Sequence, residues 1–117
     1  MKKIYYLKTC STCIRILKEL NLPSDVTLQD IKDNPLTEKQ LEELYDLAGS
    51  YEALFSRRAQ LYKKYELKGK QLSELDFKKY ILEHYTFLSR PVLVFNDQIF
   101  IGNSSKTVEA ARKAIHE

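Results

Sequence analysis

The spacing of apolar residues in the first thirty positions predicts a strand, a helix and a second strand. Residues 3–7 include a continuous apolar run, which is typical of a strand buried on both faces. Over residues 11–20 the apolar positions recur at helical spacing, and Asn21 and Pro23 mark the end of this helix. Residues 26–29 alternate in polarity and predict a short second strand.

A block of three short helices is predicted between residues 37 and 85. Thr37 is a good N-cap, and Gln40 completes a capping box that opens a helix ending near Gly49. The next helix covers residues 60–67, and Ser73 caps the third. In the first of these helices the buried face is predicted to contain Leu41, Leu44, Tyr45, Leu47 and Ala48. In the third it is predicted to contain Phe77, Tyr80, Ile81 and His84.

The last third of the chain predicts a hairpin and a closing helix. Residues 92–95 and 98–101 form two strands around a turn at Asn96 and Asp97. Ser104 or Ser105 caps the final helix, whose inward positions are Val108, Ala111 and Ile115. The order βαβ, helical block, ββα predicts an α/β fold with a four-stranded mixed sheet and helices on its faces. No repeat or linker interrupts the chain, so we expect residues 1–117 to form a single domain.

Two cysteines lie at the junction between the first strand and the first helix. If Cys10 precedes the helix, the free N–H groups of the first turn and the helix dipole favour its thiolate. Cys13 lies one turn further on, where it can attack a covalent intermediate formed on Cys10. The spacing therefore predicts a redox pair with Cys10 as nucleophile and Cys13 as resolving thiol.

Two other interpretations of the cysteines stay open on sequence grounds. Free cysteines pack well in protein cores, so both could be structural. A zinc site needs four ligands, of which this pair supplies two, and His84 and His116 lack zinc-finger spacing. We therefore predict no metal site.

Composition restricts the function classes. Of the 117 residues, 44% are hydrophobic and 30% are charged, as in an ordinary globular domain. The net charge of +3 is too small to predict direct nucleic-acid binding. No apolar run approaches the roughly 20 residues of a membrane span or the core of a signal peptide. We therefore expect a cytoplasmic protein, in which a cysteine pair stays reduced between reactions.

Four sequence marks in order resemble the ArsC/Spx family, which includes the glutaredoxin-type arsenate reductases and their Spx and YffB relatives. The resemblance spans nearly the whole chain and implies a thioredoxin-like fold with a helical insertion at about residues 37–85. The marks are Thr9-Cys10-Ser11-Thr12-Cys13, Leu54 to Ala59 with Tyr62, Ser89-Arg90-Pro91-Val92, and Val94-Phe95 through Ile101-Gly102.

The resemblance implies roles for individual residues. Cys10 matches the family's nucleophile, and Cys13 matches the second cysteine of the Spx-like subgroup. Pro91 matches a proline that is cis in thioredoxin-like folds, and Arg90 matches the arginine before it. Arg58 matches the family's middle arginine, and its neighbour Arg57 takes that role if the register shifts by one. Arginine binds oxyanions and carboxylates through two parallel hydrogen bonds.

The remaining predicted substrate-binding residues are Thr9, Ser11 and Thr12, which surround Cys10 in the sequence. For the arginines, the alternatives are a solvated helix face at Arg57 and Arg58 and a surface loop charge at Arg90.

The sequence departs from the arsenate reductases in one important place. The family's third arginine, shortly after the last strand, is replaced by a stretch without arginine, Gly102-Asn103-Ser104-Ser105. This loss weakens the case for arsenate as substrate. It leaves a thiol–disulfide activity intact, because that activity needs only the cysteine pair.

Two functions are compatible with these features. The first is a glutaredoxin-like thiol oxidoreductase without bound cofactor, which uses glutathione or another small thiol as co-substrate and thioredoxin or glutaredoxin as reductant. The second is an Spx-type redox-sensing regulator that binds the C-terminal domain of the RNA polymerase α subunit. Gly49 matches a glycine of the Spx polymerase contact, although a glycine is also expected there as a helix C-cap.

Overall fold

The chain divides into two units in the computed structural model, which describes residues 2–117. We call residues 2–34 with 90–117 the sheet unit, and residues 35–89 the helical unit. The single-domain organisation expected from the sequence stays a prediction.

The sheet unit contains a four-stranded mixed sheet in the order β2-β1-β3-β4. Its strands are β1 (Lys2–Tyr6), β2 (Thr27–Asp30), β3 (Val92–Phe95) and β4 (Gln98–Ile101). β1 runs parallel to β2 and antiparallel to β3, and β3 and β4 form an antiparallel hairpin. This arrangement confirms the predicted mixed sheet. The turn at Asn96 has a positive φ of 58°, a conformation that asparagine tolerates well.

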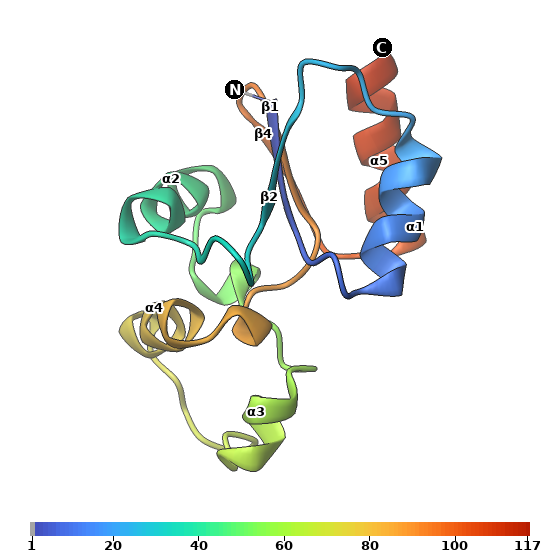
Figure 1. Ribbon diagram of the computed structural model, residues 1–117. Coiled ribbons are helices and arrows are strands. Elements are labelled where there is room, and N and C mark those ends of the chain that lie inside the picture. Colours follow the sequence, from blue (N-terminus) through green and yellow to red (C-terminus); the bar gives the residue numbers. More distant parts are fainter. Residues whose placement is uncertain (1) are drawn as a thin grey trace. The chain divides into compact units, whose positions relative to one another are not determined.

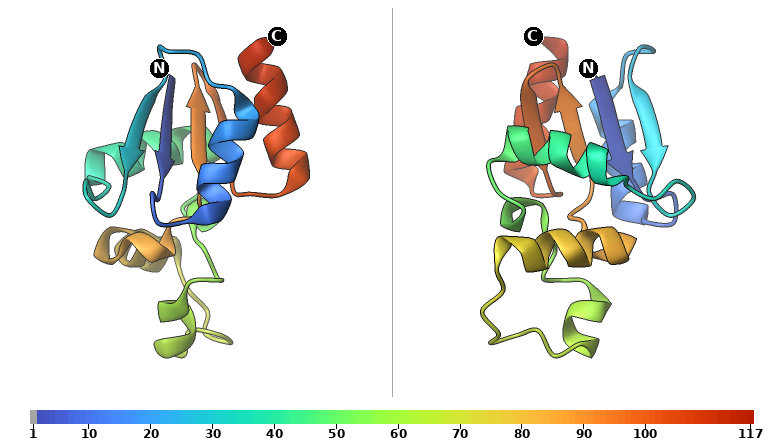
Figure 2. Two further views of the ribbon diagram at one scale, coloured as in Figure 1. Left: turned by 45° about the vertical axis from the view of Figure 1, so that its right-hand side comes forward. Right: turned by 90° about the vertical axis from the view of Figure 1, so that its left-hand side faces the viewer.

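Two helices, α1 (Ser11–Leu20) and α5 (Ser105–His116), lie side by side on one face of this sheet (Figure 2). They bury a continuous apolar cluster formed by Ile4, Tyr6, Cys13, Ile16, Leu20, Leu93, Phe95 and Ala111. Val108 and Ile115 pack against the cluster beside Ala111, which confirms the predicted inward face of the last helix. The Cys13 side chain is thus part of the core of the sheet unit.

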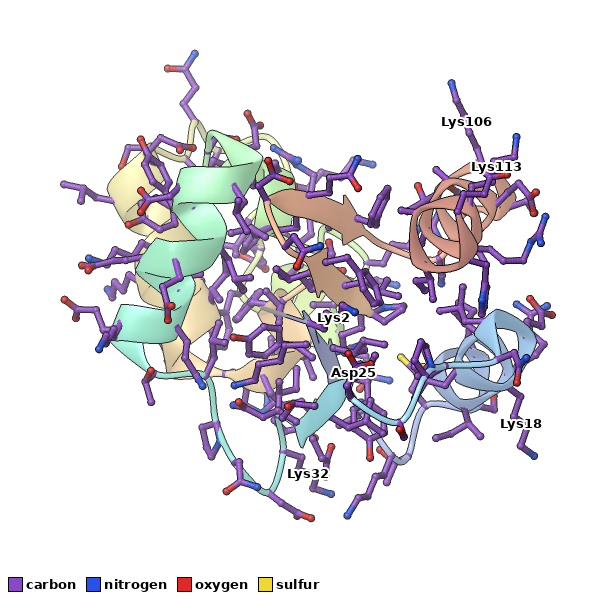
Figure 3. All side chains as sticks on the ribbon, turned by 90° about the horizontal axis from the view of Figure 1, so that it is seen from above. Lys2, Lys18, Asp25, Lys32, Lys106 and Lys113 are labelled. Atoms are coloured by element: carbon purple, nitrogen blue, oxygen red, sulfur yellow. The ribbon has the colours of Figure 1, made fainter. Side chains whose placement is uncertain are left out.

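The central strands are buried on both faces, as the continuous apolar run predicted. Ile4 and Tyr6 point into the cluster, while the alternate residue Tyr5 and its neighbours Val92 and Val94 are buried as well. At the start of β1, Lys2 forms an ion pair of 3.0 Å with Asp25 (Figure 3). Both side chains are exposed, so this pair contributes little to stability.

The helical unit consists of five short helices (Figure 1). They are α2 (Glu38–Ala48), η1 (Glu52–Leu54), α3 (Gln60–Lys64), α4 (Glu74–Glu83) and η2 (Tyr85–Phe87). Two of them begin with capping boxes, Thr37 with Gln40 and Ser73 with Asp76. Gly49 ends α2 with a φ of 87°, a conformation that side chains disfavour.

An aromatic cluster around Phe55 stabilises the helical unit. The Phe55 ring lies 4.8 Å from the ring of Phe77 and 5.4 Å from that of Phe87. Adjacent backbone hydrogen bonds join Ser56 N–H to the Phe87 carbonyl and Ser89 N–H to the Leu54 carbonyl. The segment after η1 is therefore fixed against η2 by both side-chain and backbone contacts.

Three expectations for the helical unit are wrong in detail. α3 ends at Lys64, three residues early, because Glu66 adopts a left-handed conformation with φ 56°. His84 lies beyond the end of α4, where its ring accepts a hydrogen bond from Thr86 N–H. Tyr45, which was predicted on the buried face of its helix, is 36% exposed, and its ring lies 4.4 Å from that of Tyr51.

None of the helices in residues 2–117 has the length and apolar character needed to cross a membrane.

The capping box of α2 yields a stability prediction. Replacing Thr37 with alanine removes the side-chain acceptor for Gln40 N–H, and we expect it to lower the free energy of unfolding by about 1 kcal/mol. Thr37→Ser keeps the hydroxyl and should retain most of that stability. Urea denaturation followed by circular dichroism measures both, and equal losses in the two variants would contradict the capping role.

Candidate active site

Cys10 is the N-cap of α1. Its backbone is extended, with φ −95° and ψ 108°, and its carbonyl accepts the first helical hydrogen bond, 3.1 Å from Ile14 N. Its own N–H donates to the Leu7 carbonyl at 3.0 Å, which turns the chain from β1 into the helix. The half-buried Cys10 side chain therefore lies at the end of α1 where free backbone N–H groups are found.

The surroundings of Cys10 favour its thiolate. Burial alone would raise the pKa of Cys10, but hydrogen bonds from the backbone N–H and the thiol of Cys13 lower it. The positive charge of Arg90 and the N–H of Thr12 act in the same direction, so the pKa of Cys10 lies below its ordinary value.

Cys13 has the opposite preference. Its side chain is fully buried among the apolar residues of the sheet unit, and this burial is the main reason that its pKa rises to about 11. The neighbouring Cys10 also raises the pKa of Cys13, through a hydrogen bond and through charge. Two thiols within one helical turn therefore differ in acidity, and Cys10 loses its proton at a lower pH than Cys13.

Arg90 and Pro91 lie in the same unit as the cysteines. The Arg90–Pro91 peptide bond is cis, as the resemblance implied, and the Pro91 carbonyl accepts a hydrogen bond of 2.9 Å from Gly102 N–H. Pro91 is buried and Arg90 is half-buried just before β3. The charge of Arg90 acts on both cysteines, lowering the pKa of each.

The polar residues around Cys10 differ in their exposure. Thr9 and Ser11 are exposed on either side of the half-buried Cys10, while Thr12 is half-buried and directs its N–H toward the sulfur. The structure thus gathers these residues around one sulfur atom. Their part in substrate binding stays a prediction.

Asp30 is a residue of the site that sequence reasoning missed. It is the one charged residue in residues 2–117 that is buried, with 7% of its surface exposed. Its carboxylate accepts a hydrogen bond of 3.2 Å from the backbone N–H of Lys8, and Ile31 N–H donates to the Tyr6 carbonyl beside it. Asp30 thus fixes the loop that leads into Cys10. The sequence gives only a weak indication of this role, because Asp30 is simply an acidic residue at the end of β2.

Arg57 and Arg58 belong to the helical unit. Arg57 forms an ion pair of 2.7 Å with Glu52, and its guanidinium carbon lies 5.5 Å from the centre of the Phe77 ring. Arg58 is exposed. Whether either arginine acts together with Cys10 stays a prediction. Within residues 2–117, no three His, Cys, Asp or Glu side chains are grouped closely enough to hold a metal ion.

Comparison with known proteins identifies the family. The sequence pattern of the ArsC family matches residues 5–111, which is most of the chain. The chain belongs to the ArsC family. No protein with a curated description matches it.

Solved structures of ArsC relatives share the fold. A possible arsenate reductase from Streptococcus mutans UA159 is 30% identical, with a TM-score of 0.72 over 90% of this chain and 92% of its own. The arsenate reductase from Vibrio cholerae is 23% identical, with a TM-score of 0.77 over 97% and 96%. A YffB protein is 19% identical, with a TM-score of 0.79 over 98% and 99%. The four-stranded mixed sheet with its helices therefore matches the thioredoxin-like ArsC fold, as the resemblance implied.

The opposite pKa shifts of the two cysteines predict selective alkylation by iodoacetamide in the reduced protein. The alkylation rate of Cys10 should rise with pH and give an apparent pKa below the free-cysteine value of about 8.5, because only the thiolate reacts. Cys13 should stay unreactive until the pH approaches 11. Mass spectrometry of the labelled peptides measures both rates against pH.

Arg90→Gln provides the control for this titration. Loss of the positive charge should raise the pKa of Cys10, while Lys39→Gln, an exposed lysine of α2, should leave it unchanged. A Cys10 that titrates like free cysteine in the unmodified protein would contradict the assignment.

The hydrogen bond from Lys8 predicts a stabilising role for Asp30. Asp30→Ala leaves the Lys8 N–H without its acceptor, and we expect a loss of about 1–3 kcal/mol in the free energy of unfolding. Asp30→Asn keeps an acceptor oxygen and should lose less. Amide hydrogen exchange at Lys8 reports the same contact, and unchanged protection in Asp30→Ala would show that the contact is unimportant.

Proposed function

We propose that the protein is a glutaredoxin-like thiol–disulfide oxidoreductase that works in the cytoplasm with the Cys10–Cys13 pair. The observation that carries this proposal is the contrast between the cysteines at the start of α1. Cys10 is half-buried with a lowered pKa, whereas Cys13 is buried with a pKa of about 11. A more acidic thiol that forms the thiolate first and a less acidic, buried thiol suit the roles of nucleophile and resolving residue.

In the first step, the Cys10 thiolate attacks one sulfur of a disulfide substrate. A bond forms between Cys10 and that sulfur, and the substrate disulfide breaks to release the other half as a thiolate. Backbone N–H groups of α1 stabilise the charge on Cys10 before attack. The guanidinium of Arg90 supports the same charge.

In the second step, Cys13 attacks the Cys10 sulfur of the mixed disulfide. Formation of that mixed disulfide removes the Cys10 thiolate, whose charge and hydrogen bond had raised the pKa of Cys13. Cys13 therefore loses its proton more readily after the first step than before it. A bond forms between Cys13 and Cys10, and the bond from Cys10 to the substrate sulfur breaks, which releases that half of the substrate as a thiolate. The Cys13 proton passes to solvent, and the two cysteines have together supplied two electrons.

The resulting Cys10–Cys13 disulfide needs an external reductant. We propose thioredoxin or glutaredoxin for this role, with glutathione or another small thiol as the co-substrate that can resolve the first adduct. The names of the relatives raise arsenate as a further substrate, but disulfides are the better fit to this chain because disulfide exchange needs no oxyanion site.

An Spx-type regulatory role draws no support from Gly49. This glycine ends α2 with φ 87°, and the turn itself requires a residue that tolerates this conformation. Binding to the polymerase α C-terminal domain is therefore the second proposal, with the enzyme preferred.

Turnover of a glutathione mixed disulfide tests the enzyme proposal. With glutathione present and glutathione reductase as the coupled readout, we expect Cys10→Ser to lower the rate by about 100-fold or more, because the attacking sulfur is lost. Without added glutathione, Cys13→Ser mixed with the glutathione mixed disulfide should accumulate protein carrying one glutathionyl group on Cys10, detected by intact mass spectrometry.

Ser24→Ala, an exposed hydroxyl of the sheet unit, is the matched control and should leave the rate unchanged. A Cys10→Ser variant with the wild-type rate would refute the proposal. Absent turnover combined with redox-dependent binding to the polymerase α C-terminal domain would establish the regulator instead.

A further inference from the structure

A cavity in the helical unit is not used by the proposed redox chemistry. It has a volume of about 420 Å³, within the usual range for sites that bind small molecules. Its walls come from η1 and the residues after it, from α3, and from the segment that leads into α4. The lining residues are Glu52, Arg57, Tyr62, Lys70, Gln71, Leu72 and Phe77.

Two neighbouring side chains, Glu52 and Phe77, hold the Arg57 guanidinium in place at the wall of this cavity. One guanidinium nitrogen donates to the Glu52 carboxylate at 2.7 Å, and the Phe77 ring lies beneath the guanidinium. The Glu52 carboxylate raises the pKa of Arg57, with a smaller contribution from the Tyr62 phenol. A guanidinium has five N–H donors, so this arrangement leaves donors available to a ligand while its geometry is fixed in advance.

A second positive charge lines the same cavity. Lys70 is exposed, and no carboxylate in residues 2–117 forms an ion pair with it. It ends a segment, residues 57–70, that contains six basic residues and one acidic residue. The two cations and the single carboxylate of the lining give the cavity an excess of positive charge, which favours an anionic ligand.

The rest of the lining offers a small apolar surface, to which the half-buried side chains of Tyr62 and Leu72 contribute. Phe77 is buried within the aromatic cluster around Phe55, and Tyr62 contacts the Phe55 ring edge-on at 6.0 Å. Leu72 is half-buried beside them. Aromatic and aliphatic side chains of this kind bind an apolar body, while Gln71 adds a polar amide at the rim.

We propose that this cavity binds a small organic anion, in which a phosphate or carboxylate head adjoins a flat apolar body. The head binds Arg57 and Lys70, and the body packs on the half-buried side chains of Tyr62 and Leu72. The site lies entirely within the helical unit, so ligand binding there does not require the Cys10 thiolate.

Titration of the isotopically labelled full chain, followed by nuclear magnetic resonance, tests this site with phenyl phosphate, phenylacetate and inorganic phosphate. We expect phenyl phosphate to bind with a Kd of about 1 mM or tighter, as suits a fragment of this size. The shifted amides should be those of Tyr62, Gln71 and Leu72. Inorganic phosphate should bind about tenfold more weakly, and phenylacetate shows whether a carboxylate head replaces the phosphate.

Arg57→Gln and Lys70→Gln should each weaken phenyl phosphate binding by about fivefold or more, because each removes a charged hydrogen-bond donor. Lys39→Gln, an exposed lysine of α2 in the same unit, is the matched control and should bind normally. Leu72→Ala should reduce the preference for phenyl phosphate over inorganic phosphate.

Cys10→Ser separates this site from the redox proposal, since it should abolish disulfide turnover and leave phenyl phosphate binding unchanged. Absence of shifts at 10-fold the expected Kd would overturn the proposal. Equal binding by Arg57→Gln, or shifts confined to residues outside the cavity, would overturn it as well.

Discussion

The proposed chemistry of this protein depends on the interaction between the Cys10 sulfur and the backbone N–H groups at the start of α1. A helix N-terminus stabilises a nearby negative charge by about 0.3–1 kcal/mol at exposed sites, and by more where the group is partly buried. Cys10 is half-buried, and its charge also faces the Arg90 guanidinium. The strand before α1 and the hairpin strand after Arg90 belong to the same sheet, so the fold itself brings these groups together.

The same helical turn gives Cys13 a contrasting environment. Three residues after Cys10, the helix has rotated its side chain into the apolar cluster between the sheet and α5. The position of each cysteine relative to the first turn of α1 therefore explains why Cys10 is half-buried and Cys13 is buried. This explains how a short sequence motif can encode two thiols of different acidity.

Most of the fold follows from local rules, which is why it was predictable. The bounds of α1 and of the β3–β4 hairpin match the predicted ones because capping, periodicity and turn residues act over a few positions. The cysteine pair was predictable for the same reason. Asp30 was not, because its contact with Lys8 joins residues 22 positions apart and the pattern of β2 gives no sign of it. The contact of Arg57 with Phe77 likewise depends on how the turn after η1 packs against α4, 20 positions further along the chain, and the sequence pattern does not indicate it.

The segment that replaces the third family arginine supports a disulfide substrate over an oxyanion. Ser104 caps α5, with its hydroxyl accepting from Thr107 N–H at 3.1 Å and donating to the Thr107 hydroxyl at 2.8 Å. These residues are therefore engaged in starting a helix, and they present neutral groups that bind an oxyanion more weakly than a guanidinium would. A disulfide carries no such charge at the sulfur under attack. Under the proposed function, a missing cation after β4 would weaken arsenate binding and leave disulfide attack by the Cys10 thiolate unaffected.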